Sequence, residues 1–350
     1  KRGIQRFITP ELESAMRHTL ARGEQVLLFL NRRGYANHPV CCDCGDTISC
    51  KNCDISLTLH RHTNALKCHY CGLSRQSTTT CPACGSSPCP ACGSSRIRLL
   101  GLGTEKVEAG VARLFPKARI ARLDKDTTAR KGSLLKVLKG LKERTVDILV
   151  GTQMVAKGHD FPNITLVGVI CADSSLSLPD FRAGERTFQL LAQVAGRAGR
   201  GDVPGKVVMQ TYNPEHFSIL SARAQNFEAF YDHEIQFRNL LNYPPFSRLV
   251  QLRVTGRDSA ITRDLAQAIG QACRERGREN PVYAKAIEVL GPIEAPISRI
   301  AGRFRWQILI KSKRVKDLNN FVRTIMTTQA PLFNHRRVTV AVDVDPLDML

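Results

Sequence analysis

The chain has 350 residues, 51 Lys and Arg against 31 Asp and Glu, and a formal net charge of +20. Its length allows two or three domains with cores of their own, while no stretch approaches the roughly 18 apolar residues of a membrane span. The first residues also lack the apolar core of a signal peptide. So large a basic excess predicts a polyanionic partner, above all nucleic acid, more strongly than it predicts solubility alone.

The first 40 residues predict a helix and then a buried strand. Apolar side chains recur at helical spacing over 11–22, and QVLLFL (25–30) is a continuous apolar run of strand length. A polar, basic segment follows in LFLNRRGY (28–35), which carries Arg32 and Arg33 directly after the predicted strand.

Five C-x2-C pairs follow in the segment 41–93. They are Cys41 and Cys44, Cys50 and Cys53, Cys68 and Cys71, Cys81 and Cys84, and Cys89 and Cys92. Each pair can supply two adjacent corners of a tetrahedral zinc site, so four pairs complete two closed, structural sites. Paired knuckles without a signal peptide favour metal binding in a reducing compartment over a disulfide framework, so we expect a cytoplasmic location.

One pair is redundant for two zinc ions. CPACGSSP (81–88) is followed by CPACGSS (89–95), which indicates a short tandem duplication. The first three pairs are therefore predicted ligands, and the fourth is either Cys81 and Cys84 or Cys89 and Cys92.

An alternation of helices and strands resumes after the cysteines. We predict helices at 105–115, 130–143 and about 180–198, and strands at 118–123, 146–151, 164–170 and 206–212. Strands of continuous apolar character that alternate with helices indicate a parallel sheet covered on both faces. Residues 1–40 and 94–242 are thus predicted to form one α/β domain, with 41–93 as an insertion.

Residues 214–242 are predicted to be helical, and the residues after them indicate a second domain. Tyr243-Pro244-Pro245 breaks the pattern, and we place the boundary there, with a C-terminal domain at 243–350. The predicted order is strand 248–254, helix 259–277, strands 286–290 and 304–311, helix 315–328 and strand 337–343, which is the ferredoxin-like βαββαβ arrangement. At the start of the strand 304–311, Phe304 and Trp306 are expected to face away from Arg305 and from Arg303, which directly precedes the strand.

Two polar segments of the α/β domain carry candidate functional residues. ILVGTQMVAKGHDFPNITLV (148–167) holds Thr152, Lys157 and Asp160 between two strands, and LLAQVAGRAGR (190–200) ends a predicted helix with Gln193, Gly196, Arg197, Gly199 and Arg200. Arg197 and Arg200 would share a helix face and suit phosphate contact, with the glycines letting a nucleotide come close. Two solvated arginines at a helix C-terminus are the alternative.

These segments resemble motifs V and VI of superfamily-2 helicases, which belong to the second RecA-like lobe. With the cysteine-rich insertion, and with ADSSLSLPDFRAGERTFQLL (172–191), YPPFSRL (243–249) and LGPIEAPISRIAGRFRWQILIK (290–311), the chain resembles the PriA family of replication-restart helicases over essentially its whole length. The resemblance implies ATP-dependent 3′→5′ DNA unwinding at stalled forks and primosome assembly, with single-strand-binding protein and other primosome proteins as partners.

The resemblance also implies roles for individual residues. Arg197 and Arg200 would touch the phosphates of Mg²⁺-bound ATP, with Asp160, Gln193 and Gly196 nearby, and Thr152, Lys157, Arg32 and Arg33 would face DNA. No G-x-x-x-x-G-K-[ST] and no acidic Mg²⁺ box occur in the 350 residues. In the family these elements lie in the first lobe, so this chain by itself is expected not to hydrolyse ATP. A non-enzymatic zinc-containing adaptor is the alternative.

Overall fold

The structure is a computed structural model. It describes residues 7–30, 39–41, 43, 50, 57–60, 65–68, 72–76, 92–94, 97–99, 104–124, 127, 132–156, 161, 163–176, 178–199 and 203–349.

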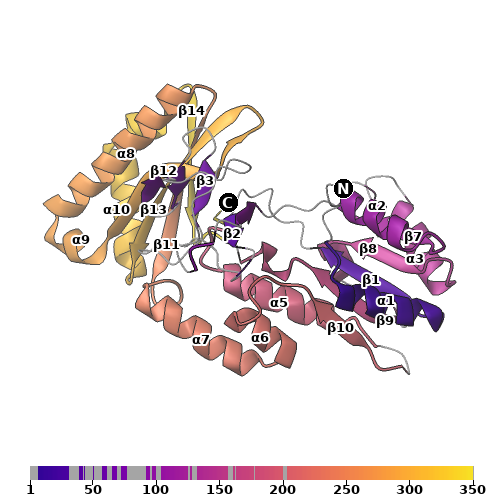
Figure 1. The fold of residues 1–350 in the computed structure, drawn as a ribbon. Helices are drawn as coiled ribbons and strands as arrows, with labels where there is room; N and C mark the ends of the chain where they lie inside the picture. Colours follow the sequence, from indigo (N-terminus) through magenta and orange to yellow (C-terminus); the bar gives the residue numbers. More distant parts are fainter. Residues whose placement is uncertain are drawn as a thin grey trace.

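A five-stranded parallel sheet organises the first part of the chain (Figure 1). Its strands pair in the order β10-β9-β1-β8-β7, all parallel. Their bounds are β1 (Gln25–Leu30), β7 (Ile120–Leu123), β8 (Ile148–Gly151), β9 (Ile164–Ile170) and β10 (Lys206–Met209). The predicted α/β fold with a parallel sheet is confirmed.

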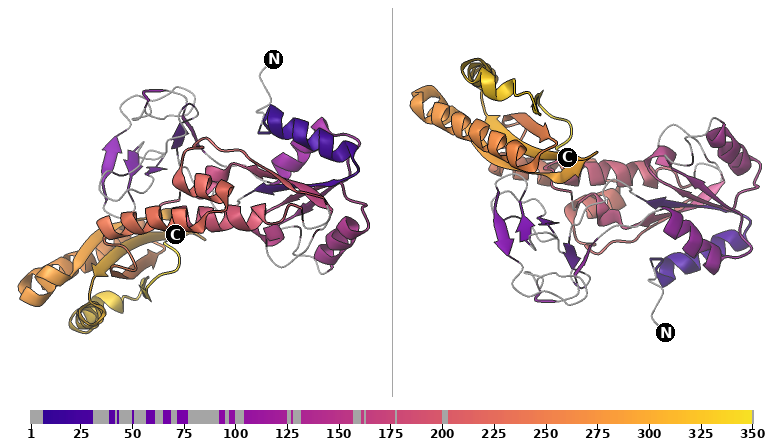
Figure 2. Two further views of the ribbon diagram at one scale, coloured as in Figure 1. Left: turned by 90° about the horizontal axis from the view of Figure 1, so that it is seen from below. Right: turned by 90° about the horizontal axis from the view of Figure 1, so that it is seen from above.

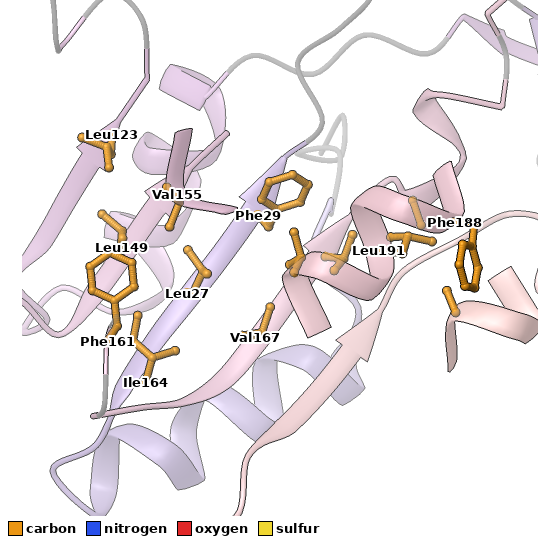
Figure 3. Close-up of a cluster of buried hydrophobic side chains, with 14 of the residues drawn as sticks. Leu27, Phe29, Leu123, Leu149, Val155, Phe161, Ile164, Val167, Phe188 and Leu191 are labelled. Carbon is orange, nitrogen blue, oxygen red and sulfur yellow. The ribbon is translucent and has the colours of Figure 1, made fainter. Parts of the chain in front are cut away.

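Helices cover both faces of this sheet because its central strands are apolar on both sides. Val26 and Leu28 pack with α1 (Pro10–Ala21) and α2 (Thr104–Leu114). Leu27 and Phe29 belong to the opposite cluster (Figure 3). The helices that contribute to it are α3 (Ser133–Lys142), α4 (Gln153–Ala156), α5 (Ala183–Ala195), α6 (Phe217–Ala224) and α7 (Phe227–Leu240). A short 3-10 helix, Ala172–Ser174, follows β9.

The cysteine-rich region is framed by a pair of short strands. β2 (Pro39–Cys41) and β6 (Ile97–Leu99) run antiparallel, with Cys41 opposite Ile97. Between them, β3 (Thr58–His60), β4 (Ala65–Lys67) and β5 (Ser74–Gln76) form an antiparallel sheet in chain order. The region lies beside the C-terminal sheet (Figure 2), where a Cβ on Gly72 would be 3.7 Å from Ile293.

The residues beyond 247 form a four-stranded antiparallel sheet in the order β12-β13-β11-β14. Its elements are β11 (Arg248–Gly256), α8 (Ser259–Glu279), α9 (Pro281–Ala286), β12 (Glu288–Ile300), β13 (Arg303–Ser312), α10 (Val315–Thr328), α11 (Ala330–Phe333) and β14 (Val338–Val344). α8 and α10 bury one face, and Trp306 packs against that cluster. Trp306 is therefore half-buried against this cluster, while Arg305 lies on the other face of β13.

Most predicted bounds differ from the structure by a few residues. The helix expected at about 180–198 spans only 183–195, the strand expected at 206–212 ends at Met209, and the strand expected at 286–290 continues to Ile300. No helix among the described residues is long and apolar enough to cross a membrane.

Candidate nucleotide, DNA and zinc sites

Thr152 lies where β8 ends, at the carboxyl edge of the parallel sheet. It is 7% exposed, and its N–H donates to the carbonyl of Leu123, the last residue of β7, over 3.3 Å. Ligands of open parallel sheets bind at this edge. The preceding Gly151 lets α4 turn back over the strand, since a Cβ there would be 2.1 Å from Val155 Cγ2.

Gln193, Gly196 and Arg197 lie at the end of α5. The helix stops at Ala195, and Gly196 caps it with its N–H directed to the carbonyls of Ala192 and Val194. Arg197 therefore belongs to the turn after the helix, with its N–H bonded to Val194 O at 3.0 Å. The expectation that Arg197 lies on a helix face is wrong, because the helix ends before it, and Arg200 lies outside the described residues.

The two glycines of this turn have different roles. Gly199 has a φ of +68°, and a Cβ on it would lie 2.2 Å from the backbone nitrogen of Gly205. The close approach that Gly199 permits is thus that of the chain's own segment 204–205. A Cβ on Gly196 would lie 3.6 Å from the carbonyl oxygen of Ala192, and Gly196 is exposed. Of the two glycines, only Gly196 therefore leaves room for another molecule.

The structure keeps Thr152 and this turn apart. The N–H of Gly199 bonds to the carbonyl of Ile164, the first residue of β9, at 3.1 Å. Thr152 follows the last residue of β8, and β8 and β9 are both parallel to β1. The candidate DNA residue and the candidate phosphate residues therefore lie toward opposite edges of the sheet.

Several predicted site residues lie outside the described part of the chain. They are Arg32, Arg33, Lys157, Asp160 and Arg200 of the motor motifs, and Cys44, Cys53, Cys71, Cys81, Cys84 and Cys89 of the cysteine pairs.

Cys41 and Cys92 lie side by side, with their sulfur atoms 3.6 Å apart. Two thiolates on one zinc ion, each about 2.3 Å from the metal at a tetrahedral angle, are about 3.8 Å apart. The N–H of Asp43 donates to the Cys41 sulfur over 3.4 Å, which favours a negative thiolate. Both the distance and the donor fit shared coordination of one metal ion.

Cys50 and Cys68 are both buried, in one cluster with Leu57 and Leu66. Cys68 begins a tight turn, since its N–H bonds to Leu73 O at 2.8 Å and its carbonyl accepts from Gly72. Within the described residues no group of three or more metal-ligating side chains gathers. Cys41, Cys50 and Cys68 all belong to this one cluster.

A polar cluster at the end of β7 escaped the sequence interpretation. Asp124 is 1% exposed and accepts from the hydroxyl of Thr104 at 2.5 Å and from the N–H of Thr127 at 2.9 Å. Arg122 lies 3.4 Å from the same carboxylate and also contacts Glu105 and Glu108. The sequence feature that could have indicated this cluster is the polar run LDKDTT at the end of an apolar strand, at the same edge of the sheet as Thr152.

Three family models match the chain. The model described as the PriA DNA helicase Cys-rich region domain covers 50–76, the helicase conserved C-terminal domain covers 100–202, and the primosomal protein N C-terminal domain covers 239–347.

Curated relatives match over almost the whole chain. The replication restart protein PriA of Bacillus subtilis is 41% identical over 100% of the chain, and that of Synechocystis is 38% identical over 100%. The PriA of Haemophilus influenzae is 38% identical over 99%. The chain spans 42%, 40% and 45% of these relatives, which is less than half of their length.

Proposed function

We propose, from the membership of this chain in the PriA family of replication restart proteins, that it supplies one motor lobe, a two-zinc module and a DNA-binding C-terminal domain to an ATP-dependent 3′→5′ DNA helicase. The observation that carries the proposal is the succession of three matching family models along one chain, on a fold that contains a parallel sheet. The proposed substrate is DNA at stalled replication forks.

Arg197 is proposed to contact the phosphates of ATP, together with Arg200. Mg²⁺-ATP would be held mainly by the first lobe, and a guanidinium beside the transferring phosphate neutralises charge that develops in the transition state. The position of Arg197 supports this role, because it follows the helix end at the exposed Gly196. Gln193, also exposed, and Asp160 are proposed to complete the nucleotide contacts.

This role is tested by Arg197→Ala in the full-length protein. The kcat of DNA-stimulated ATP hydrolysis should fall about 10³-fold, as for other arginine fingers, while single-strand affinity changes little. Arg22→Ala is the matched control, because Arg22 makes only an exposed ion pair with Glu24. Near-normal hydrolysis by Arg197→Ala contradicts the assignment, whereas a parent protein without DNA-stimulated ATP hydrolysis would favour the non-enzymatic adaptor.

The carboxyl edge of the sheet is proposed to face the DNA backbone. Thr152 lies at this edge, Arg32 and Arg33 come directly after β1, and Lys157 follows α4. Because the strands are parallel, their carboxyl ends meet at one edge, which supports a common role for the segments that follow them.

The two zinc sites are proposed to divide the cysteines as follows. The match to the Cys-rich model, 50–76, encloses two pairs, which supports one site formed by Cys50, Cys53, Cys68 and Cys71. The 3.6 Å approach of Cys41 to Cys92 supports a second site formed by Cys41, Cys44, Cys89 and Cys92. Cys81 and Cys84 are then the redundant copy.

Zinc analysis separates the two copies. The protein purified under reducing, chelator-free conditions should contain two zinc ions, Cys92→Ser should lose one, and Cys81→Ser should keep both. Cys81→Ser is a matched control, since it removes a thiol at the equivalent position of the other copy. Loss of zinc from Cys81→Ser with retention in Cys92→Ser reverses the assignment.

The C-terminal domain is proposed to be ferredoxin-like and to bind the nucleic-acid backbone. The strand order β12-β13-β11-β14, with α8 and α10 on one face, supports the fold. Residues 246–340 contain 18 Lys and Arg against 7 Asp and Glu, and this excess supports the binding of a polyanion. Single-strand-binding protein and other primosome proteins are the proposed protein partners.

A further inference from the structure

The residues after β14 cross from the C-terminal domain to the beginning of α5. We call 345–349 the closing segment. Arg182 Nη1 donates to the carbonyl of Pro346 at 2.8 Å, and Arg186 Nη2 donates to the carbonyl of Leu347. The N–H of Met349 lies 3.4 Å from Asp180 Oδ2. Asp180 and Arg182, just before α5, and Arg186, in its first turn, thus bind the segment at Met349, Pro346 and Leu347.

Asp180 is the centre of these contacts. It is 2% exposed, accepts from the N–H of Arg182 at 2.9 Å, and pairs with Arg186 Nη1 at 2.8 Å. Burial raises the pKa of Asp180, and Arg186 and Arg182 oppose that shift. This buried carboxylate therefore fixes the guanidinium of Arg186 and the backbone N–H of Arg182, and removal of Arg186 would leave the charge of Asp180 buried without its ion-pair partner.

Met349 anchors the end of the segment. It is 0% exposed, whereas Leu347, two residues earlier, is 84% exposed. Its cluster includes Leu66 of the cysteine-rich region, Leu309 of β13, and Phe181, which stacks on Tyr243 with ring centroids 4.7 Å apart. Three parts of the chain therefore meet where α5 begins.

The residues proposed to contact the phosphates of ATP lie at the other end of α5. The helix has 13 residues, so it spans about 20 Å at about 1.5 Å per residue, and Gly196 and Arg197 follow directly. It packs along its length, with Phe188 stacked on Phe230 of α7 at 4.3 Å, and it lies between the parallel sheet and the C-terminal domain (Figures 1 and 2). A packed helix of this kind carries a displacement at one end to the other.

We infer that Arg186, Asp180 and the closing segment are positioning elements for Arg197: they fix the start of α5 against the C-terminal domain and thereby set where its arginine-bearing end lies. The inference rests on the proposed function, since it assumes that Arg197 acts on ATP. A misplacement of about 1 Å can cost up to about 10²-fold in rate, so the contacts are expected to influence kcat without touching ATP.

The test uses the full-length protein and two matched pairs of variants. Arg186→Met removes the bonds to Asp180 and Leu347, while Arg186→Lys keeps the charge opposite Asp180. Met349→Ala removes most of the buried side chain at the end of the closing segment, and Leu347→Ala changes an exposed residue of the same segment. For each variant we would measure the kcat and KM of DNA-stimulated ATP hydrolysis, zinc content and the thermal unfolding midpoint.

Arg186→Met and Met349→Ala should lower kcat about 10-fold at a temperature where all variants remain folded, with the KM for ATP within about twofold and zinc retained. Arg186→Lys should recover much of the loss, and Leu347→Ala should match the parent. Unchanged kcat in Arg186→Met and Met349→Ala overturns the inference, as does a loss that only follows unfolding or zinc release. Arg197→Ala keeps the two failures distinct, because its normal activity would instead overturn the proposed role of Arg197 in ATP hydrolysis.

Discussion

At the scale of single residues, close contacts rather than residue type decide what a glycine does. Gly196 and Gly199 look equivalent in GRAGR, yet one has free space beside it and the other touches Gly205. The sequence could not separate them, because the approaching segment 204–205 is brought there by the tertiary fold. The same holds for Cys92, whose place beside Cys41 depends on the pairing of β2 with β6.

This difference predicts a difference in stability. Gly199→Ala should destabilise the chain by about 1–3 kcal/mol, because it adds a Cβ at positive φ and 2.2 Å from a backbone nitrogen. Gly196→Ala is the control and should change the free energy of unfolding by less than about 1 kcal/mol, since its φ is −67°. Urea unfolding of both variants measures this, and equal midpoints would refute the steric argument.

At the scale of elements, patterning predicted most of the fold. The strands 25–30 and 164–170 and the helix 315–328 agree with the structure residue for residue, because their apolar runs and helical periodicity are unbroken. The predicted end of β12 falls ten residues short of Ile300, since Gly291, Pro292 and Pro296 normally end a strand. It is an edge strand with irregular register, where proline is tolerated.

The start of α6 should make stability depend on pH. His216 caps this helix by accepting from the N–H of Ser218 at 3.2 Å, and burial lowers its pKa to about 4, with Asp173 opposing the shift. An unfolded histidine has a pKa of about 6.5, so below that pH the unfolded state binds more protons and the folded state loses stability.

The variant His216→Asn keeps a capping side chain that does not titrate. Relative to this variant, the parent chain should lose about 2 kcal/mol of unfolding free energy between pH 7.5 and pH 5. Urea unfolding at both pH values measures the difference. Parallel pH curves for the two proteins would show that His216 does not cause the acid sensitivity.

At the scale of the whole molecule, the charge of the C-terminal domain includes two arginines at the beginning of β13, on the face of the sheet away from α8 and α10. Arg303 and Arg305 alternate with Trp306, which packs against the helices. Burial, and then the neighbouring Arg253, lowers the pKa of Arg305, so a nearby phosphate would relieve repulsion between the two guanidinium groups. The sequence predicted this alternation, but left open which face is buried.

Binding of the chain to a labelled single strand should therefore fall steeply between about 50 and 200 mM salt, by about 10³-fold if six or more phosphates are neutralised. Replacement of Arg303 and Arg305 by Ser should reduce the slope by about two, whereas the same change at Arg17 and Arg22 on and beside α1 should leave it unaltered. A salt-independent affinity would exclude backbone recognition.

The order of pairing in the parallel sheet bears on how the chain reaches its native state during synthesis. β1 is the first of its strands to be made, yet it lies in the centre, with Val26 opposite Ile148 on one side and Leu166 on the other. About 120 residues must emerge from the ribosome before the first of these partners exists, and such non-local pairing forms slowly. Until then QVLLFL is an unpaired apolar strand, so nascent chains that stall before β8 are the species that we expect to aggregate or to engage chaperones.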